Sequence, residues 1–280
     1  MIEKLRLIEA LASVFEARFM KPNYEDHLCL ETDPWQALAF FAGSYAFERQ
    51  GRSPNFAPAA VDVLVEFGKD GESLENPQIA QHIWKRFCKC LSGLGLNERN
   101  NPLCPRGTWY ANKHGRRQTR QLSAIECVQG LSDHNLVVWA KHELAGDNAK
   151  GAHKALVKIN GVGGKIVSLF LRDIAWIFNV VPMKDRELLQ PIDIWIRRVV
   201  AELADKESPS DDIERAHWIV RASKEGRVSP EKVNAGMWYL GAQIAGSQYV
   251  LKRLLADPTK LLDGIGQHVW TLENAAKAWK

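Results

Sequence analysis

The fold is decided by one stretch, Leu156-Val157-Lys158-Ile159-Asn160-Gly161-Val162-Gly163-Gly164-Lys165-Ile166-Val167-Ser168-Leu169-Phe170-Leu171. Apolar residues recur at helical spacing at both ends of it, which predicts one helix ending near Ile159 and another from Lys165 to about Asn179. The glycines between them break any helix and permit positive φ angles. Two helices with so short a connection must turn back sharply, so we expect a helix-hairpin-helix over about residues 147–179.

The glycines of this stretch also have a chemical use. Without Cβ atoms nearby, the backbone amides of Gly161, Val162 and Gly163 can approach an anion, at the positive end of the second helix's dipole. We expect a nucleic-acid phosphate there, and a plain turn between core helices is the alternative. Ile159 and Ile166 occupy positions where an ATPase phosphate-binding loop and a dinucleotide fingerprint, respectively, need glycine, so both motifs are excluded.

Length and composition permit a large core and exclude several classes. The chain has 280 residues, is 46% hydrophobic and carries a net charge of +4, with a pI near 8.7, so it is only mildly basic. Its start is a charged amphipathic run and not a secretory signal, and no apolar stretch is long enough to span a bilayer. The five cysteines are an odd number without metal-ligand spacing, so we expect reduced thiols in a cytosol and no metal.

Helical periodicity covers most of the chain, so the predicted fold class is all-α. Cap residues mark expected helix starts at Asp33, Asn76, Ser132, Asp193 and Ser229. The helix that Ser229 opens should continue through Leu255, and its glycines suggest that a neighbour packs closely on its backbone; they are Gly236, Gly241 and Gly246.

The periodicity vanishes between Asn97 and Gln121, which predicts a loop. This loop interleaves basic residues, among them Arg116 and Arg117, with aromatic ones. Such a composition suits the backbone and the bases of a nucleic acid. A solvated surface loop is the alternative, because charge runs are usually just solvated.

Two motifs resemble those of a known superfamily. Gly161-Val162-Gly163-x-Lys165 is similar to the hairpin of the helix-hairpin-helix DNA glycosylases of base excision repair, and Pro191-Ile192-Asp193 resembles the setting of their active-site carboxylate. The long spacing between Lys165 and Asp193 and the segment Val233–Gly241 are most similar to archaeal-type 8-oxoguanine glycosylases. The resemblance extends over about residues 132–200 and 229–255.

The resemblance implies a bifunctional DNA glycosylase and AP lyase. Lys165 would attack the sugar C1′ of a damaged nucleotide flipped out of the duplex, while Asp193 would stabilise the positive charge on the sugar and assist proton transfer. The base leaves, a Schiff base forms, and β-elimination breaks the strand. The helix dipole and partial burial should favour the neutral amine of Lys165. The alternatives are a charged lysine that only contacts phosphate and an Asp193 that only caps a helix.

The same resemblance implies two helical lobes with the active-site cleft between them, one formed by residues 34–192 and the other by 1–33 plus 193–280. The helix 165–179 rises about 22 Å, and the connector 180–192 could extend about 43 Å, so the chain can return Asp193 to Lys165. Candidates for a wedge that fills the flipped nucleotide's place are Tyr45 and Phe47, and Trp238 could stack on the base; core packing is the alternative for all three.

The implied substrate is double-stranded DNA containing a damaged base, with 8-oxoguanine as the expected lesion, no cofactor, and no membrane. No cysteine follows Cys127, so the iron–sulfur cluster of many endonuclease III-like members is absent. We expect a monomer in the cytoplasm, associated with the nucleoid, or in the nucleus of a eukaryote. Two other functions stay open: a non-catalytic helix-hairpin-helix DNA-binding protein, and a glycosylase for oxidised pyrimidines.

Overall fold

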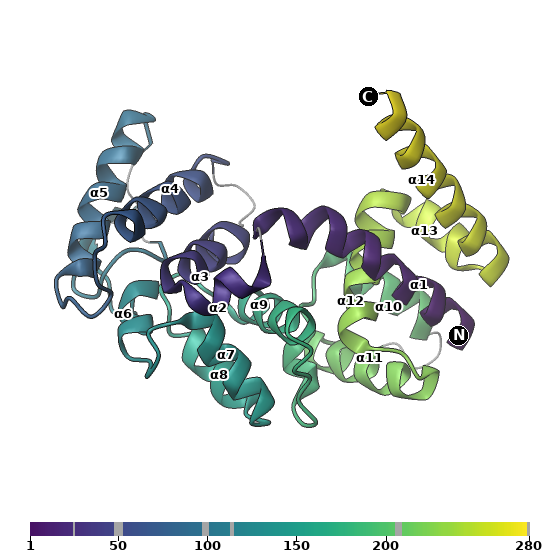
Figure 1. Cartoon of the computed structure of the whole chain (residues 1–280). Coiled ribbons are helices and arrows are strands. Elements are labelled where there is room, and N and C mark those ends of the chain that lie inside the picture. The colour runs from purple at the N-terminus through teal and green to yellow at the C-terminus, as the bar shows by residue number, and fades with distance from the viewer. Residues whose placement is uncertain (25, 48–52, 97–100, 113–114, 205–208, 279–280) are drawn as a thin grey trace. The chain divides into compact units, whose positions relative to one another are not determined.

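The computed structural model confirms the all-α fold class. It describes residues 1–24, 26–47, 53–96, 101–112, 115–204 and 209–278, and helices make up nearly all the regular structure of these ranges (Figure 1). The exception within them is an antiparallel ribbon of two strands, β1 (Trp109–Asn112) and β2 (Gly115–Gln118). The prediction of an irregular loop between 97 and 121 is therefore wrong for this part. No described helix is long and apolar enough to cross a membrane.

The helices form two compact units. Unit 1 comprises Met1–Met20 and Arg186–Lys280, and unit 2 comprises Lys21–Asp185. The boundaries fall at residues 20 and 185, whereas the resemblance implies boundaries at 33 and 192. The difference at the first boundary arises because α2 (His27–Thr32) packs on neighbouring helices of unit 2. At the second boundary, Arg186 forms a bidentate ion pair with Glu231, which attaches it to unit 1.

Unit 2 contains, after a short 3₁₀ turn (Lys21–Asn23), the helices α2, α3 (Pro34–Phe41), α4 (Phe56–Lys69), α5 (Ile79–Gly93), α6 (Ala124–Gln129), α7 (Leu136–Ala145), α8 (Ala149–Leu156) and α9 (Gly164–Ile177). A π-helical turn (Ala42–Ala46) extends α3. The helix α3 packs against α4 and α7, and α7 packs against α8 and α9. This arrangement holds α9 within the core of the unit.

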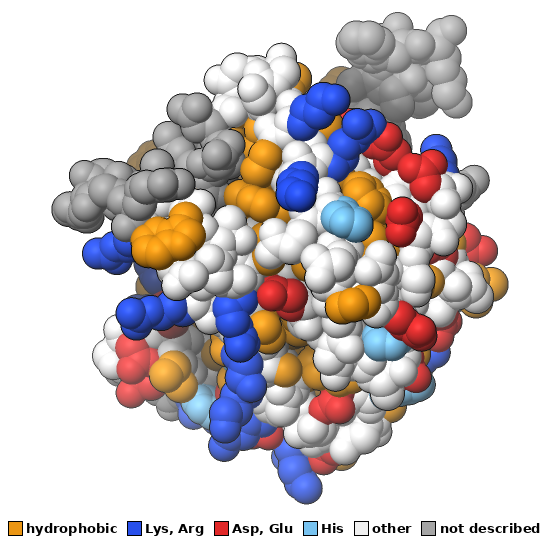
Figure 2. Space-filling view, turned by 90° about the vertical axis from the view of Figure 1, so that its left-hand side faces the viewer, with side chains coloured by type: hydrophobic (Ala, Val, Ile, Leu, Met, Phe, Trp, Pro, Cys, Tyr) orange, Lys and Arg blue, Asp and Glu red, His pale blue; other side chains and the backbone are white. Residues whose placement is uncertain are grey.

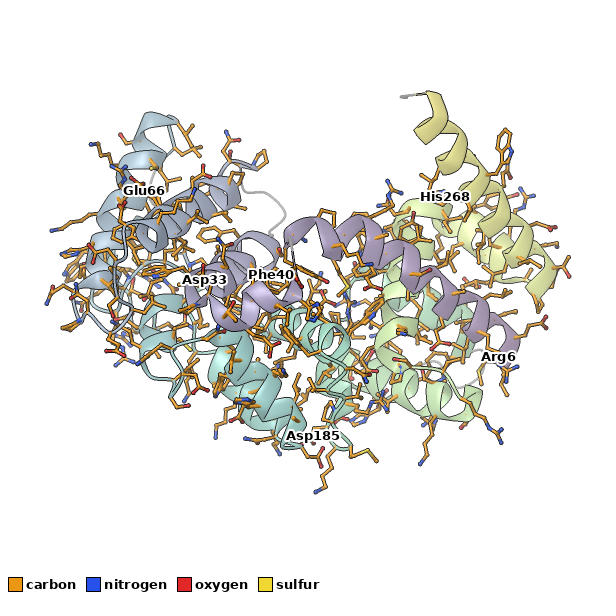
Figure 3. All side chains as sticks on the ribbon, viewed as in Figure 1. Arg6, Asp33, Phe40, Glu66, Asp185 and His268 are labelled. Atoms are coloured by element: carbon orange, nitrogen blue, oxygen red, sulfur yellow. The ribbon has the colours of Figure 1, made fainter. Side chains whose placement is uncertain are left out.

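Two of the predicted caps have different outcomes. Asp33 caps α3 as predicted, because its carboxylate accepts two backbone amide hydrogen bonds at 2.8 and 3.2 Å (Figure 3). Asn76 does not cap α5. Its side chain instead accepts a hydrogen bond from the amide of Gln78 at 3.0 Å, and the helix begins only at Ile79. The Asn76-Pro77 pair therefore forms a turn before the helix.

The predicted cap of α7 is also wrong. Asn135, and not Ser132, accepts hydrogen bonds from the first amides of the helix, at 2.9 and 3.0 Å. The side-chain amide of Asn135 also donates to the carbonyl oxygens of Leu30 and Glu31. A serine hydroxyl has a single donor, so it could reach only one of these two carbonyl oxygens.

A buried polar cluster fixes α9 in the core of unit 2. Arg172 and Asp173 are 1% and 3% exposed, and the Arg172 guanidinium donates to the Asp173 carboxylate at 2.8 Å. The hydroxyl of Tyr45 donates to the other carboxylate oxygen at 3.1 Å. Burial raises the pKa of Asp173, and Arg172 and Tyr45 oppose that shift. Each partner therefore offsets part of the cost of burying this group.

Unit 1 is assembled from both ends of the chain. It contains α1 (Ile2–Phe15), a π turn (Glu16–Met20), a 3₁₀ turn (Arg186–Leu189), α10 (Ile194–Ala204), α11 (Asp212–Gly226), α12 (Pro230–Tyr239), α13 (Gln248–Leu255) and α14 (Pro258–Ala278). The helix α1 packs against α12, and the two cross in the view of Figure 1. The core of the unit forms around this pair.

The helix predicted from Ser229 through Leu255 is interrupted. Ser229 caps α12 as predicted, but a π turn (Leu240–Ala245) ends at Gly246, which has a φ of 62°. Ser247 then caps α13. Pro258 follows the end of α13 and is also the first residue of α14, because proline is accepted in a first helical turn.

The close backbone packing suggested by the glycines is confirmed at two positions. A Cβ on Gly236 would lie 1.9 Å from the carbonyl oxygen of Ile8 on α1, and a Cβ on Gly241 would lie 2.9 Å from the side chain of Trp195. At Gly246 a Cβ would meet nothing within 4 Å. The backbones of α1 and α12 are therefore in contact at Gly236, which only glycine allows.

We predict that Gly236→Ala will destabilise unit 1. The added methyl would overlap backbone and not a movable side chain, so the free energy of unfolding should fall by at least about 1–3 kcal/mol. Gly266→Ala on α14 is the matched control, because nothing lies within 4 Å of its Cβ position; it should be neutral or stabilising by up to about 1 kcal/mol. Urea unfolding of both variants measures the difference. Equal stability of the two would contradict the close contact.

Candidate functional site

The glycine-rich turn connects α8 and α9, which pack against each other in unit 2. After α8 ends at Leu156, the amide of Val162 donates to the carbonyl of Ile159 at 3.0 Å and closes the turn. Gly161 has a φ of 72°, in the left-handed region that favours glycine. Val162 is 4% exposed. The amide of Val162 is thus committed to the turn. The expectation that this amide meets an anion, together with those of Gly161 and Gly163, is therefore wrong for Val162.

The first turn of α9 has no side chain to cap it. Gly163 occupies the N-cap in an extended conformation and supplies no capping group. Gly163, Gly164 and Lys165 are all exposed, and a Cβ on Gly163 would meet nothing within 4 Å. An anion therefore has open access to the positive end of α9, at Gly163 to Lys165.

Lys165 lies in this first turn with an exposed side chain. The helix dipole expected from the sequence acts on it, whereas the expected partial burial is not found. No carboxylate of the described ranges lies within ion-pair distance of its ammonium group. Lys165 belongs to unit 2, and Asp193 belongs to unit 1.

A histidine that the sequence patterns do not single out lies against the same turn. His153 on α8 is half-buried, and two of its ring atoms lie 3.5 and 3.6 Å from the Cβ position of Gly164. Burial lowers the pKa of His153, and a hydrogen bond with the backbone of Gly164 opposes that shift. The ring thus supports the start of α9 from the side of α8. Its spacing resembles that of any other polar residue on α8, so the sequence holds no signal for it.

Asp193 caps α10 as predicted. One carboxylate oxygen, Oδ1, accepts hydrogen bonds from the amides of Trp195 and Ile196, both at 2.9 Å. Among the described residues, none donates to its second oxygen, Oδ2. Asn234 on α12 donates to the carbonyl of Pro191 at 3.3 Å. The carboxylate is therefore held rigidly, with one oxygen available to a ligand.

Trp238 belongs to an aromatic cluster in unit 1. Its ring makes edge-to-face contacts with Phe15 and Phe19, with centroids 5.7 and 5.1 Å away. Trp238 and Phe19 are half-buried. Trp238 thus packs against other side chains of the protein, which is the alternative to stacking on a base. Part of the aromatic cluster is nevertheless open to solvent.

The edge of this cluster is polar. Arg18 donates to the hydroxyl of Tyr239 at 2.8 Å, and that hydroxyl lies 3.0 Å from Nε2 of His268, which is labelled in Figure 3. Burial and the charge of Arg18 lower the pKa of His268. The guanidinium of Arg18 also lies 5.7 Å from the ring centre of Phe19. An exposed cation therefore borders the aromatic surface.

The two wedge candidates are buried. Tyr45 is 3% exposed and donates its hydroxyl to Asp173, and Phe47 is 4% exposed and packs edge-on against Phe87. Neither side chain can enter a duplex without leaving the core. The alternative of core packing is thus found for both, because remote partners on α5 and α9 that the local sequence does not reveal hold them inside.

The basic residues expected to contact DNA lie on the ribbon. Tyr110 pairs with Arg117, and Ala111 pairs with Arg116. Arg117 is exposed. The side chain of Arg116 lies outside the described residues, and so do Arg99 and Lys113. The ribbon therefore presents at least one of the two expected arginines to solvent.

The cysteines and acidic residues offer no metal site in the described part of the chain, where no group of three His, Cys, Asp or Glu could hold an ion. All five cysteines are free. Burial raises the pKa of Cys127 to about 11 and also raises that of Cys104. Neither thiol is thus activated as a nucleophile.

Comparisons with known proteins yield a relative but no family. The uncharacterized protein MJECL21 of Methanocaldococcus jannaschii is 42% identical over 220 residues, which cover 71% of this chain and 48% of the relative. The chain thus spans about half the length of this relative. No family model matches, and no solved structure matches. The site is therefore interpreted from its own geometry.

We predict that Gly161 and Gly163 serve different purposes. Gly161→Ala should destabilise unit 2 by about 1–2 kcal/mol, because an L side chain is strained at a positive φ. Gly163→Leu should leave the unfolding free energy nearly unchanged but weaken binding to undamaged duplex about tenfold, since hydrogen bonds to a charged group contribute ~1.5–3 kcal/mol. Unfolding curves and fluorescence anisotropy measure the two effects.

The control is Gly93→Leu at the end of α5, where a Cβ would also meet nothing within 4 Å. It should alter neither stability nor binding. Unchanged affinity of a folded Gly163→Leu protein would remove the turn from the DNA-binding surface.

Proposed function

We propose that this protein is a DNA glycosylase of base excision repair with AP lyase activity, which removes 8-oxoguanine through Lys165 and cleaves the strand by β-elimination. The observation that carries the proposal is the start of α9. There an uncapped helix N-terminus with two exposed glycines is followed directly by an exposed lysine without a described ion-pair partner. The proposal includes the helix-hairpin-helix assignment of α8 and α9.

The turn supports the proposal through the way it would position DNA. Phosphate contacts carry no sequence information, but they fix the register of a protein on a duplex. A phosphate at Gly163 and Gly164 would hold one nucleotide at a defined distance from Lys165, the next residue along the chain. The open space at Gly163 leaves room for such a phosphate.

The place of Lys165 on α9 supports its role as the nucleophile. Lys165 follows directly after the two exposed glycines in the first turn of α9, so its amine would lie beside a nucleotide whose phosphate the turn holds. In the proposed reaction, the amine nitrogen forms a bond to C1′ as the bond between C1′ and the base breaks, and the base leaves with that electron pair. Opening of the sugar ring gives a Schiff base, and loss of a 2′ proton then expels the 3′ phosphate. No oxidant or metal is needed for these steps.

The rigid setting of Asp193 supports its role beside the sugar. Two backbone amides hold its Oδ1, so its orientation is fixed before substrate arrives. Its second oxygen would face the cationic sugar in the proposed complex and accept a proton from the attacking amine. The connector between α9 and α10 is long enough to permit this approach.

The aromatic cluster supports a base-binding role for unit 1. A flipped base needs a flat apolar surface, and extrahelical bases are commonly held between aromatic or apolar side chains. The half-buried rings of Trp238 and Phe19 offer such a surface. This role for Trp238 adds to its packing role and does not replace it.

One observation favours a second candidate, a DNA-binding protein without catalysis. Lys165 is exposed and not partly buried, and an exposed lysine at a helix N-terminus is well suited to contact phosphate. A passive binder, however, does not need a rigid carboxylate in a Pro-x-Asp setting. A glycosylase for oxidised pyrimidines would use the same two residues and differs only in the base that it releases.

The test is base release from duplexes that each contain one lesion. We predict release from 8-oxoguanine in preference to thymine glycol and uracil. Lys165→Gln should abolish turnover and retain binding, because the amides of the turn remain. Asp193→Asn should react far more slowly with little loss of stability, since asparagine caps a helix about as well as aspartate. Chromatography of the released base and gel analysis of the strand measure both steps.

Lys150→Gln is the matched control, because Lys150 is an exposed lysine on α8; it should release base at the wild-type rate. No base release by the wild type from any lesion would favour the passive binder. Release of oxidised pyrimidines without 8-oxoguanine would assign the other glycosylase class.

A further inference from the structure

Segment 101–122, which carries the ribbon, is joined to the glycine-rich turn by hydrogen bonds at both of its ends. The amide of Leu122 donates to the carbonyl of Lys158, and the amide of Asn160 donates back to Leu122 at 2.7 Å. The side chain of Asn160 also donates to the carbonyl of Asn101 at 3.0 Å. Asn101 and Asn160 are fully buried. Segment 101–122 therefore leaves and rejoins the body of unit 2 at the turn.

The base of the ribbon is ordered by further hydrogen bonds. The amide of Thr119 donates to the carbonyl of Thr108, and that of Gly107 donates to the carbonyl of Thr119. The amide of Arg106 donates to the carboxylate of Glu126, which also closes the capping box of α6. The strands are thus held in one register above the turn.

The ribbon combines positive charge with an exposed aromatic ring. Residues 101–122 contain Arg106, Lys113, Arg116, Arg117 and Arg120 and no Asp or Glu. Arg106, Arg117 and Arg120 are exposed, and none forms an ion pair with a described carboxylate. Trp109 is 58% exposed. Figure 2 shows that Lys and Arg side chains also gather in a band on the face that it displays.

Exposed arginines next to an exposed tryptophan favour one kind of nucleic acid over another. A duplex backbone alone would satisfy the arginines, but it would leave the ring of Trp109 in water. Unpaired nucleotides offer phosphates together with free base faces, on which an aromatic side chain can stack. Tyr110 is half-buried and lies directly opposite Arg117, so these two side chains project from one face of the narrow ribbon, and Trp109, opposite Gln118, projects from the other.

We propose that the ribbon binds unpaired nucleotides of DNA, with Trp109 stacked on a base and Arg117 and Arg120 on the phosphates. The inference rests on the proposed function, because flipping a nucleotide out of the duplex leaves unpaired bases next to the phosphate held by the turn. It assigns to Trp109 a surface role that the buried Tyr45 and Phe47 do not fill.

The test compares affinities for three undamaged probes, a duplex, a duplex with a central bubble, and a single strand, at several salt concentrations. The wild type should prefer the bubble and the single strand over the duplex. Trp109→Ala should lose about tenfold on these two probes and little on the duplex, as expected for one lost stacking contact. Trp109→Phe should keep most of the preference.

The double variant Arg117→Gln/Arg120→Gln should weaken binding to all three probes and reduce the salt slope by about two. The controls are Trp270→Ala, which removes a ring that is 65% exposed on α14, and Lys224→Gln, which removes an exposed charge on α11. Both should bind all probes as the wild type does. Circular dichroism confirms that each variant is folded.

Two results would overturn the proposal: a Trp109→Ala protein that binds all probes normally, or one that loses equally on all of them. Base release measured on the same proteins separates this proposal from the enzymatic one. If the wild type releases no base but Trp109→Ala still loses the bubble preference, the ribbon surface stands and the glycosylase assignment falls. If the wild type releases base normally and Trp109→Ala keeps the bubble preference, the glycosylase assignment stands and the ribbon surface falls.

Discussion

The buried side chain of Asn160 is the contact on which the arrangement of the site depends. Asn160 joins the glycine-rich turn to Asn101 through its side chain and to Leu122 through its backbone. A buried amide without such partners would cost about 1–3 kcal/mol, so the turn and the ribbon are stabilised together. The result is a surface on which an uncapped helix N-terminus, an exposed lysine and a cationic ribbon belong to one unit.

The two units contribute different parts of the proposed chemistry. Unit 2 supplies the phosphate contact and the amine, and unit 1 supplies a rigid carboxylate and an aromatic surface. Within each unit the reactive group lies at a helix N-terminus, Lys165 on α9 and Asp193 at the cap of α10. Each group is thus positioned by the backbone of the first helical turn. This division would make activity depend on how DNA brings both units to one nucleotide.

The sequence predicts well those features that depend on neighbouring residues. Asp33, Asp193 and Ser229 cap their helices because a cap acts on amides within three positions of it. Gly236 and Gly241 are likewise interpreted correctly, since close packing is a common reason for glycine within a helix.

The sequence predicts poorly what depends on remote partners. Asn135 replaces Ser132 as a cap because its side chain also reaches Leu30 and Glu31. Tyr45 is buried because Asp173 lies opposite it. The ribbon lacks alternating apolar residues, so its strands show no period, and its register depends on contacts with Glu126 and the turn. His153 is likewise not predicted, because the residue that it contacts, Gly164, belongs to the next helix.

The central claim, that the amine of Lys165 forms a covalent intermediate with the sugar, is tested most directly by reductive trapping. Borohydride should convert the Schiff base formed with an 8-oxoguanine duplex into a stable adduct, and peptide mapping by mass spectrometry identifies the modified residue. We predict a single adduct on Lys165 that is lost in Lys165→Ala. An adduct of normal yield on another lysine, or an undiminished adduct in that variant, would contradict the claim.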